Sequence, residues 1–369
     1  MRLLVVFLVA CSLLPAQGKK AKNVILFLAD AGGVPTVNAA SLHGYGEPQK
    51  LYIQSWPHMG LSDTSTASQY VSDSAAGMSA IVTGVKTHNG VISMGPDTVR
   101  GKQDGKRLKT ILEFAEEHGL STGVLTNVSI ADATPAACYS QANDRGKWGE
   151  IFLQAFTPRF GDGVDVLMGV GKPRIWDLAQ KLGKNPEEAA AAAKRKIYGS
   201  TTEVPDSDAR PVVVADKAID LPQAAQQALS RLQKNKKGYF LMIEWDAHTD
   251  DPEKGLGNLV NFDKLIREIA GKVDLKNTLL VFTADHSFDL SVRGGRRGEP
   301  VLKGWAEYKA SGKKERFFEL PSVRVHGDHT GEEVLVTAQG PGSERVNGYM
   351  PNTRIFEVMM AAWGWKADR

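Results

Sequence analysis

The sequence has very little cysteine, and it has no long apolar stretch beyond its first residues. Cys11 and Cys138 are the only two cysteines among 369 residues. If the N-terminal segment is removed, no intramolecular disulfide can form, so stability must come from the core or from bound metals. Cys138 is then expected to be a small buried residue rather than a reactive thiol. After the N-terminus, no stretch reaches the roughly 18 apolar residues that a membrane-spanning helix needs.

Basic and acidic residues are nearly equal in number. Lysine and arginine number 45 and aspartate and glutamate 42, which gives a net charge of +3. This small charge, with scattered basic residues, excludes nucleic acid as a specific partner but leaves anionic small molecules. With 42% hydrophobic and 24% charged residues, the chain is an ordinary globular one. Its length permits two domains, or one large α/β domain with insertions.

The N-terminal segment, 1–18, has the layout of a secretory signal peptide. An apolar run, 3–14, is followed by the small residues Ala16 and Gly18, and we expect cleavage near Gly18. The mature protein should therefore be exported, either periplasmic or secreted. The residues around Cys11 also resemble a lipoprotein cleavage box, but the basic region before it is very short. Lipid anchoring through Cys11 is the less favoured alternative.

Apolar runs without polar alternation recur along the chain, and such runs are typical of parallel strands that are covered on both faces. The expected strands are 23–30, 122–128, 164–168, 211–215, 239–246, 278–285 and 333–338. Helical patterns alternate with them at 108–118, 175–182, 186–197, 222–234, 256–273 and 353–363. This alternation predicts an α/β fold with a doubly wound, mostly parallel central sheet and helices on both faces.

The pattern weakens between 287 and 326, where glycine, arginine and lysine are frequent. We interpret this segment as an insertion or long loop in a single catalytic domain, 19–369. The run Arg293–Gly298 within it is a solvated loop by default. The alternative is a cationic rim beside an anionic substrate.

Small residues surround one serine in the stretch 71–84, where the sequence predicts the first turn of a helix. The hydroxyl of Ser74 would then lie among unpaired backbone N–H groups, which favour an approaching anion. Ser74 is therefore a candidate nucleophile. A helix N-cap in a close-packed segment explains the same residues, so this stretch alone does not decide.

Acids and histidines follow several of the expected strands, and ligands of open α/β sheets bind beyond the carboxyl ends of the strands. These residues are Asp30, Asp132, Thr134, Glu244, Asp246, His248, Asp285, His286 and His329. One acid could cap a helix, but several acids with histidines are hard to explain in that way. Carboxylates with histidines suit Zn²⁺, whereas carboxylate and threonine oxygens suit Mg²⁺. Alternate residues of an extended segment face the same way, so Glu244, Asp246 and His248 could share one site.

In their order along the chain, these residues resemble the motifs of the alkaline phosphatases. The resemblance covers nearly the whole mature chain and rests on Asp30 with its Gly-Gly, Asp73-Ser74-Ala75, Asp132-Ala133-Thr134-Pro135-Ala136-Ala137, Glu244 with Asp246 and His248, Thr283-Ala284-Asp285-His286, and His329-Thr330-Gly331. It implies an exported hydrolase that converts phosphate monoesters to inorganic phosphate with two zinc ions and one magnesium ion. It is compatible with a homodimer, but the sequence does not settle the oligomeric state.

The resemblance also implies roles for individual residues. Ser74 would become phosphorylated, and Arg145 would clamp the phosphoryl oxygens. One zinc would be held by Asp30, Asp285 and His286, with Asp30 bridging to magnesium. Magnesium would be held by Thr134 and Glu244, and through its waters by Asp132. The other zinc would be held by Asp246, His248 and His329.

The segment Glu244–His248 departs from the family pattern. Family members usually place several residues between the glutamate and the zinc aspartate, and again before the histidine. Asp250 or Asp251 could therefore replace one of the expected zinc ligands. Trp245 either takes the place of a side chain near the phosphate or is a core or rim aromatic.

Two other functions remain open at this point. A phosphodiesterase or nucleotide pyrophosphatase of the same two-metal superfamily would keep both zinc sites but not the magnesium residues Asp132, Thr134 and Glu244. An exported protein that only binds metal or captures phosphate would need no nucleophile, so Asp73-Ser74 argues against it.

Overall fold

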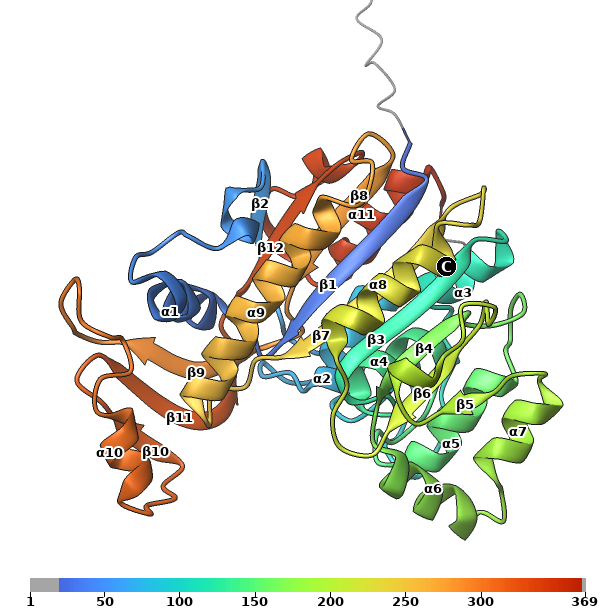
Figure 1. The fold of residues 1–369 in the computed structure, drawn as a ribbon, viewed down its shortest axis with the longest axis horizontal. Coiled ribbons are helices and arrows are strands. Elements are labelled where there is room, and N and C mark those ends of the chain that lie inside the picture. The colour runs from blue at the N-terminus through green and yellow to red at the C-terminus, as the bar shows by residue number, and fades with distance from the viewer. Residues whose placement is uncertain (1–19, 367–369) are drawn as a thin grey trace, which may run out of the picture.

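A computed structural model describes residues 20–366, and a ten-stranded sheet forms its centre (Figure 1). The expected signal peptide, 1–18, lies outside the described residues. The strand order is β13-β2-β12-β8-β1-β7-β3-β4-β6-β5. β12 is antiparallel to β2 and β8, and the other neighbouring pairs are parallel. The strands are β1 (Asn23–Asp30), β2 (His58–Asp63), β3 (Ser121–Ser129), β4 (Val166–Val170), β5 (Ile197–Tyr198), β6 (Val212–Ala215), β7 (Tyr239–Asp246), β8 (Thr278–Thr283), β12 (Val334–Gln339) and β13 (Gly348–Pro351).

Helices cover both faces of this sheet, and Figure 1 shows α8 and α9 in front of it and α4 and α11 behind it. One face carries α1 (Val34–Tyr45), η1 (Tyr52–Ser55), α8 (Leu221–Leu232) and α9 (Pro252–Ala270). The other carries α2 (Ser74–Thr83), α3 (Ile111–Glu117), α4 (Ala133–Tyr139), α5 (Trp148–Leu153), η2 (Gln154–Phe156), α6 (Lys172–Lys181), α7 (Pro186–Ala192) and α11 (Thr353–Trp363). Two short 3₁₀ turns complete the set, η3 (Thr201–Glu203) and η4 (Ser343–Arg345). The predicted doubly wound α/β fold is confirmed.

Strand β1 shows why the apolar runs lack polar alternation. Val24, Leu26 and Leu28 pack into the core on the α2 side, whereas Ile25 and Phe27 pack into the core on the α9 side. All five side chains are fully buried. A strand in this position needs apolar residues at every position, because neither of its faces meets water.

Three strands of the central sheet were not expected from the sequence: β2, β5 and β13. β5 has two residues at one edge of the sheet and begins where the expected helix 186–197 was to end. β2 and β13 lie at the opposite edge of the sheet, and several of their residues are exposed. Their sequences contain glycine, proline and polar residues, as edge strands often do. The apolar pattern that marks the central strands is therefore missing there.

The segment 287–326, expected to be an insertion or long loop, contains regular structure. It forms β9 (Ser287–Val292), α10 (Trp305–Ala310), β10 (Phe317–Glu319) and most of β11 (Val323–Thr330). The strands make a separate antiparallel sheet in the order β10-β11-β9. Figure 1 shows β9 and β11 beside α1, away from the central sheet. These strands are half-exposed and carry polar residues, so the sequence pattern resembles a loop.

Cys138 lies in α4 and is fully buried, as expected for a small core residue. Burial raises the pKa of its thiol well above the usual value, which makes the thiolate unfavourable. Within residues 20–366, no helix is both long enough and apolar enough to cross a membrane.

Small residues let α2 approach the loop that follows β8. A Cβ atom added at Gly77 would lie 2.4 Å from the backbone oxygen of Asp285, which is too close for any real contact. Because Ser74 begins the same helix, the absent side chain at Gly77 sets the distance between the serine and Asp285.

We predict that Gly77→Ala destabilises the protein by about 1–3 kcal/mol, because α2 must move away from Asp285 to admit the methyl group. Gly257→Ala in α9 is the matched control, since no atom lies within 4 Å of the added Cβ. At a half-buried helix position with room for the methyl group, this change should stabilise by up to about 1 kcal/mol. Chemical unfolding of both variants checks the prediction, and equal effects would contradict it.

Candidate active site

Ser74 is the first residue of α2, and the residue before it is the helix cap. The Asp73 side chain accepts a hydrogen bond of 3.0 Å from the backbone N–H of Ala76. The Ser74 hydroxyl is therefore not needed as a cap. It is 3% exposed and lies 3.3 Å from Nε2 of His286 and 3.5 Å from Oδ1 of Asp30.

Two groups of potential metal ligands meet beside this hydroxyl. The ligand atoms of Asp30, Asp285 and His286 all lie within 4.8 Å of one another, and so do those of His248, His286 and His329. β8, β1 and β7 are parallel neighbours, so the residues at and after their carboxyl ends gather at one edge of the sheet. The rings of His286 and His329 stack with centroids 3.8 Å apart.

The three histidines are oriented in the same way. Nδ1 of His286 donates to the Ser287 carbonyl over 3.0 Å, and Nδ1 of His329 donates to the Ser72 carbonyl over 3.0 Å. Nδ1 of His248 lies 2.7 Å from Oδ1 of an aspartate, Asp246, which accepts a hydrogen bond from it. In neutral rings these bonds leave each Nε2 free as a metal ligand.

Asp246 is held firmly, but it lies outside the two ligand groups. Its backbone N–H donates to Oδ1 of Asn127 over 2.9 Å, and its carbonyl accepts from Asn258 over 2.8 Å. The ammonium group of Lys254 lies 3.5 Å from its Oδ2. The sequence analysis missed these three residues. No motif marks them, because Asn127 comes from β3, and Asn258 and Lys254 come from α9.

Several oxygens of the site are buried without a hydrogen-bond partner. Both carboxylate oxygens of Glu244, Oδ2 of Asp285 and Oγ1 of Thr134 have no partner among the described residues. An unpaired buried carboxylate is strongly unfavourable unless a cation balances it. Oxygen donors of this kind are the ligands that hard cations such as Mg²⁺ take. The residues present therefore fit a metal centre.

The pKa values of the acids and of His248 reflect the excess of negative charge in the site. Burial, reinforced by the charge of Asp30, raises the pKa of Glu244 well above its usual value and that of Asp285 to about 6. Burial would lower the pKa of His248, but Asp30 and Asp246 outweigh it and raise the value to about 9. Without metal, the site therefore retains protons that a metal would displace.

Arg145 lies between two carboxylates at the edge of the site. Its two terminal nitrogens donate to Oδ2 of Asp73 over 3.1 Å and to Oδ1 of Asp132 over 3.0 Å. Asp132 also caps α4, because Oδ1 accepts from the backbone N–H of Ala133 over 2.8 Å. Asp73 thus connects the guanidinium group to the first turn of the serine helix.

Three residues after Glu244 remained as alternative site residues, Trp245, Asp250 and Asp251. Their surroundings differ from those of the ligand cluster. Trp245 packs on the α9 side of the sheet against Phe262, as a rim aromatic rather than as a side chain facing Glu244. Asp251 caps α9 and lies 3.6 Å from the ammonium group of Lys309, and Asp250 is exposed. Neither aspartate belongs to the ligand groups found among the described residues.

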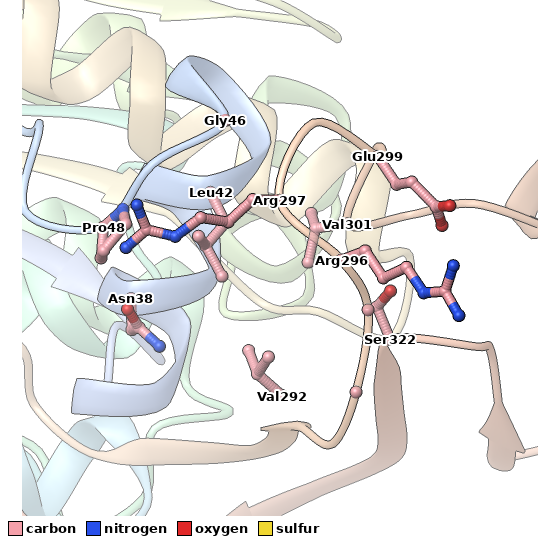
Figure 2. Close-up of a pocket in the computed structure, with 12 residues that line it drawn as sticks. Asn38, Leu42, Gly46, Pro48, Val292, Arg296, Arg297, Glu299, Val301 and Ser322 are labelled. Atoms are coloured by element: carbon pink, nitrogen blue, oxygen red, sulfur yellow. The ribbon is translucent and has the colours of Figure 1, made fainter.

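The basic run Arg293–Gly298 borders a different cavity. This cavity of about 290 Å³ lies between α1 and the loop after β9 (Figure 2). Figure 2 shows Arg297 extending toward Pro48 and Arg296 pointing the opposite way. β9 carries the chain about 20 Å from Ser287 to Arg293, so the run does not form a cationic rim at the serine.

The fold and the site together define a class of metal-dependent hydrolases with an α/β fold, in which a serine at a helix N-terminus and a cluster of metal ligands share the carboxyl edge of the sheet. Residues 21–198 and 205–322 match the family model described as alkaline phosphatase. The chain belongs to the alkaline phosphatase family, and it is a phosphomonoesterase.

Relatives support this membership over more than nine-tenths of the chain. Alkaline phosphatase 4 of Bacillus subtilis is 27% identical, with 92% of this chain and 88% of the relative covered. Alkaline phosphatase of Escherichia coli is also 27% identical, with 94% and 87% covered. Streptomycin-6-phosphate phosphatase of Streptomyces griseus is 26% identical, with 93% and 91% covered. These similarities do not favour the alternative of a phosphodiesterase.

Solved structures show the same fold. Alkaline phosphatase from the Antarctic bacterium TAB5 superposes with a TM-score of 0.77 at 23% identity, covering 95% of this chain and all of that one. The Thermus thermophilus alkaline phosphatase gives a TM-score of 0.78 at 22% identity, covering 96% and 93%.

We predict that Glu244→Gln stabilises the metal-free protein at pH 8 by at least about 2 kcal/mol, because the neutral amide avoids the free-energy cost of burying or protonating the carboxylate. The raised pKa of Glu244 means that the wild-type protein has its full stability below the unfolded value of about 4.5 and loses stability as the pH rises. With Zn²⁺ and Mg²⁺ present, Glu244→Gln should instead destabilise the protein, because the substitution removes a ligand of the metal. Unfolding in urea, with chelator or with metals, measures both effects.

Glu116→Gln is the control for this change. Burial raises the pKa of Glu116 to about 8, but its carboxylate accepts a hydrogen bond of 2.6 Å from the Thr122 hydroxyl near the start of β3. Its effect should be the same with and without metals. If Glu244→Gln also changed the stability by the same amount with and without metals, the assignment of Glu244 as a metal ligand would be contradicted.

Proposed function

We propose that this protein is an exported, metal-dependent phosphomonoesterase that works through a phosphoserine intermediate at Ser74. The observation that carries the proposal is the position of the Ser74 hydroxyl. It lies at a helix N-terminus, buried among potential metal ligands, 3.3 Å from Nε2 of His286. A simple anion-binding site would not need a hydroxyl there.

We propose three metal sites, two for zinc and one for magnesium, supported by the ligand groups and the unpaired oxygens. Asp30, Asp285 and His286 would hold the zinc next to Ser74. His248 and His329 would hold the other zinc. Asp246, which the sequence suggested as a third ligand, would act through His248, because it accepts the hydrogen bond from Nδ1 of that ring. Glu244, Thr134 and Asp30, with Asp132 acting through water, would hold magnesium. Bound metals would supply the positive charge that stabilises the attacking and leaving oxygens.

The residues of the chain then have defined tasks. The Ser74 hydroxyl gives up its proton and its oxygen forms a bond to phosphorus, while the bond between phosphorus and the ester oxygen breaks and that oxygen takes up a proton to leave as the alcohol. Water later cleaves the serine–phosphorus bond, which gives inorganic phosphate and returns a proton to the serine. Asp30 lies 3.5 Å from the serine oxygen and accepts a hydrogen bond from its hydroxyl in the ground state. His286 holds no proton at Nε2 in its neutral form, because Nδ1 donates to the Ser287 carbonyl.

Arg145 would bind the transferred phosphoryl group. Asp73 and Asp132 each accept one of its N–H groups, which fixes the plane of the guanidinium and leaves other N–H groups for phosphate oxygens. A planar fork matches two phosphoryl oxygens, and an ammonium group cannot reproduce this geometry.

Export is proposed from the signal-like sequence of residues 1–18. A periplasmic or secreted location follows from it, with lipid anchoring at Cys11 as the less favoured alternative. One catalytic domain, 19–369, would form the mature protein.

We predict that the purified protein hydrolyses p-nitrophenyl phosphate at alkaline pH, loses activity on chelation and regains it with Zn²⁺ plus Mg²⁺. Ser74→Ala should lower kcat at least 10³-fold while leaving the bound metals in place, because only the nucleophile is removed. Metal analysis of the variant is the control. Faster hydrolysis of bis-p-nitrophenyl phosphate than of the monoester would refute the proposal in favour of a diesterase.

We predict that Arg145→Lys raises the inhibition constant of inorganic phosphate by about 10–100-fold, because a bidentate charge-assisted contact is lost. Arg100→Lys is the control. Arg100 lies nearby and pairs with Asp144 over 3.2 Å at the surface, so this change should have little effect. Equal inhibition constants for the wild type and Arg145→Lys would exclude a phosphate contact.

A further inference from the structure

Tyr70 is the most exposed large hydrophobic side chain of residues 20–366. It is 90% exposed, and the next residue, Val71, is 39% exposed. The tyrosine side chain makes no hydrogen bond or ring contact with any described residue. Single exposed aromatics are ordinary on protein surfaces, so this exposure acquires meaning only from its position.

The backbone around this tyrosine is held in place. The N–H of Gln69 donates to the hydroxyl of Thr66 over 2.9 Å. The amide of Asn89 donates to the carbonyl of Val71 over 3.0 Å and accepts from the N–H of Asp73 over 3.0 Å. The ring is therefore presented by an anchored segment that leads directly to the serine.

The same segment contacts the group of three histidines. The Ser72 carbonyl accepts the hydrogen bond from Nδ1 of His329. A Cβ atom added at Gly331 would lie 3.1 Å from the carbonyl oxygen of Tyr70, so the two backbones touch. Tyr70 thus lies between Ser74, four residues further along the chain, and the strand end that carries His329.

This position is on the side where the alcohol of the substrate departs, if the proposed function holds. An in-line displacement places the leaving oxygen opposite the nucleophile. Ser74 lies against Asp30 and His286, whereas His329 and His248 form the other side of the ligand cluster. The organic group should therefore extend over His329 toward residues 70–72.

The surface there suits an uncharged group. Residues 64–72 contain no charged side chain. A flat apolar group could cover the tyrosine ring and the neighbouring valine, and both would lose contact with water.

We propose that Tyr70 and Val71 form an apolar lip that contacts the organic group of the substrate. The lip favours phosphate monoesters of aromatic alcohols over those of small polar alcohols. Tyr70 is thus a specificity-determining residue, not a catalytic one. The inference rests on the proposed function, because that function defines the leaving side.

Steady-state kinetics of Tyr70→Ala, Tyr70→Phe and the wild type test the lip with 1-naphthyl phosphate and glycerol 2-phosphate. For Tyr70→Ala, KM for the naphthyl ester should rise about fivefold more than KM for the glycerol ester, since an aromatic contact is worth a factor of roughly 2–10. Tyr70→Phe keeps the ring and should behave as the wild type. Tyr45→Ala, at another exposed tyrosine (41%) near the end of α1, should change neither KM.

Binding of two phosphonates separates the lip from the proposed reaction. Calorimetry should show that Tyr70→Ala weakens phenylphosphonate about fivefold and leaves methylphosphonate nearly unchanged. If no monoester is hydrolysed by the wild type, the proposed function fails, yet this binding difference still tests the lip.

Three results would overturn the lip. The first is an equal change for both esters and both phosphonates. The second is no change in any of them. The third is a change of oligomeric state in gel filtration of Tyr70→Ala without a change in ligand preference, which would assign the ring to contact with a second copy of the chain.

Discussion

The accumulation of negative charge at the carboxyl ends of β1, β7 and β8 is the constraint on which the rest of the site depends. Asp30, Glu244 and Asp285 are buried side by side, and the oxygens of Glu244 and Oδ2 of Asp285 have no hydrogen-bond partner among the described residues. Parallel pairing of the strands brings them together, so their repulsion is built into the fold. Bound cations would remove this repulsion and at the same time place positive charge beside the Ser74 hydroxyl.

The sequence predicted much of this arrangement, because buried parallel strands have a strong signal. The bounds of β1, β7 and α11 agree with the expected ranges. Two of the expected acids, Asp30 and Asp285, lie together with the three expected histidines, whereas Asp246 lies outside these groups. The small sheet of β9–β11 and the edge strands were not recognised, since half-exposed strands with polar residues resemble loops. Asn127 and Lys254 were missed for a different reason. They approach Asp246 only through tertiary packing, which a single sequence does not display.

The short segment between Glu244 and His248 shows how the chain adapts the family site. Trp245 faces α9, so Glu244 and Asp246 can lie on the opposite side of the strand and near the cluster. Asp246 accepts a hydrogen bond from Nδ1 of His248 and is itself held by Asn127 and Asn258. On the outer side, the anchored segment with Tyr70 borders His329 and would set which alcohols fit. On this proposal, the buried acids would govern the reaction and the uncharged rim would govern the choice of substrate.

Anomalous diffraction from crystals grown with Zn²⁺ and Mg²⁺ tests the central claim most directly. Data collected above and below the zinc absorption edge should show two zinc peaks, one bounded by Asp30, Asp285 and His286 and one beside His248 and His329. A third peak without anomalous signal should lie against Glu244 and Thr134. Density that shows Glu244 paired only with protein groups or water, with no cation in contact, would contradict the account.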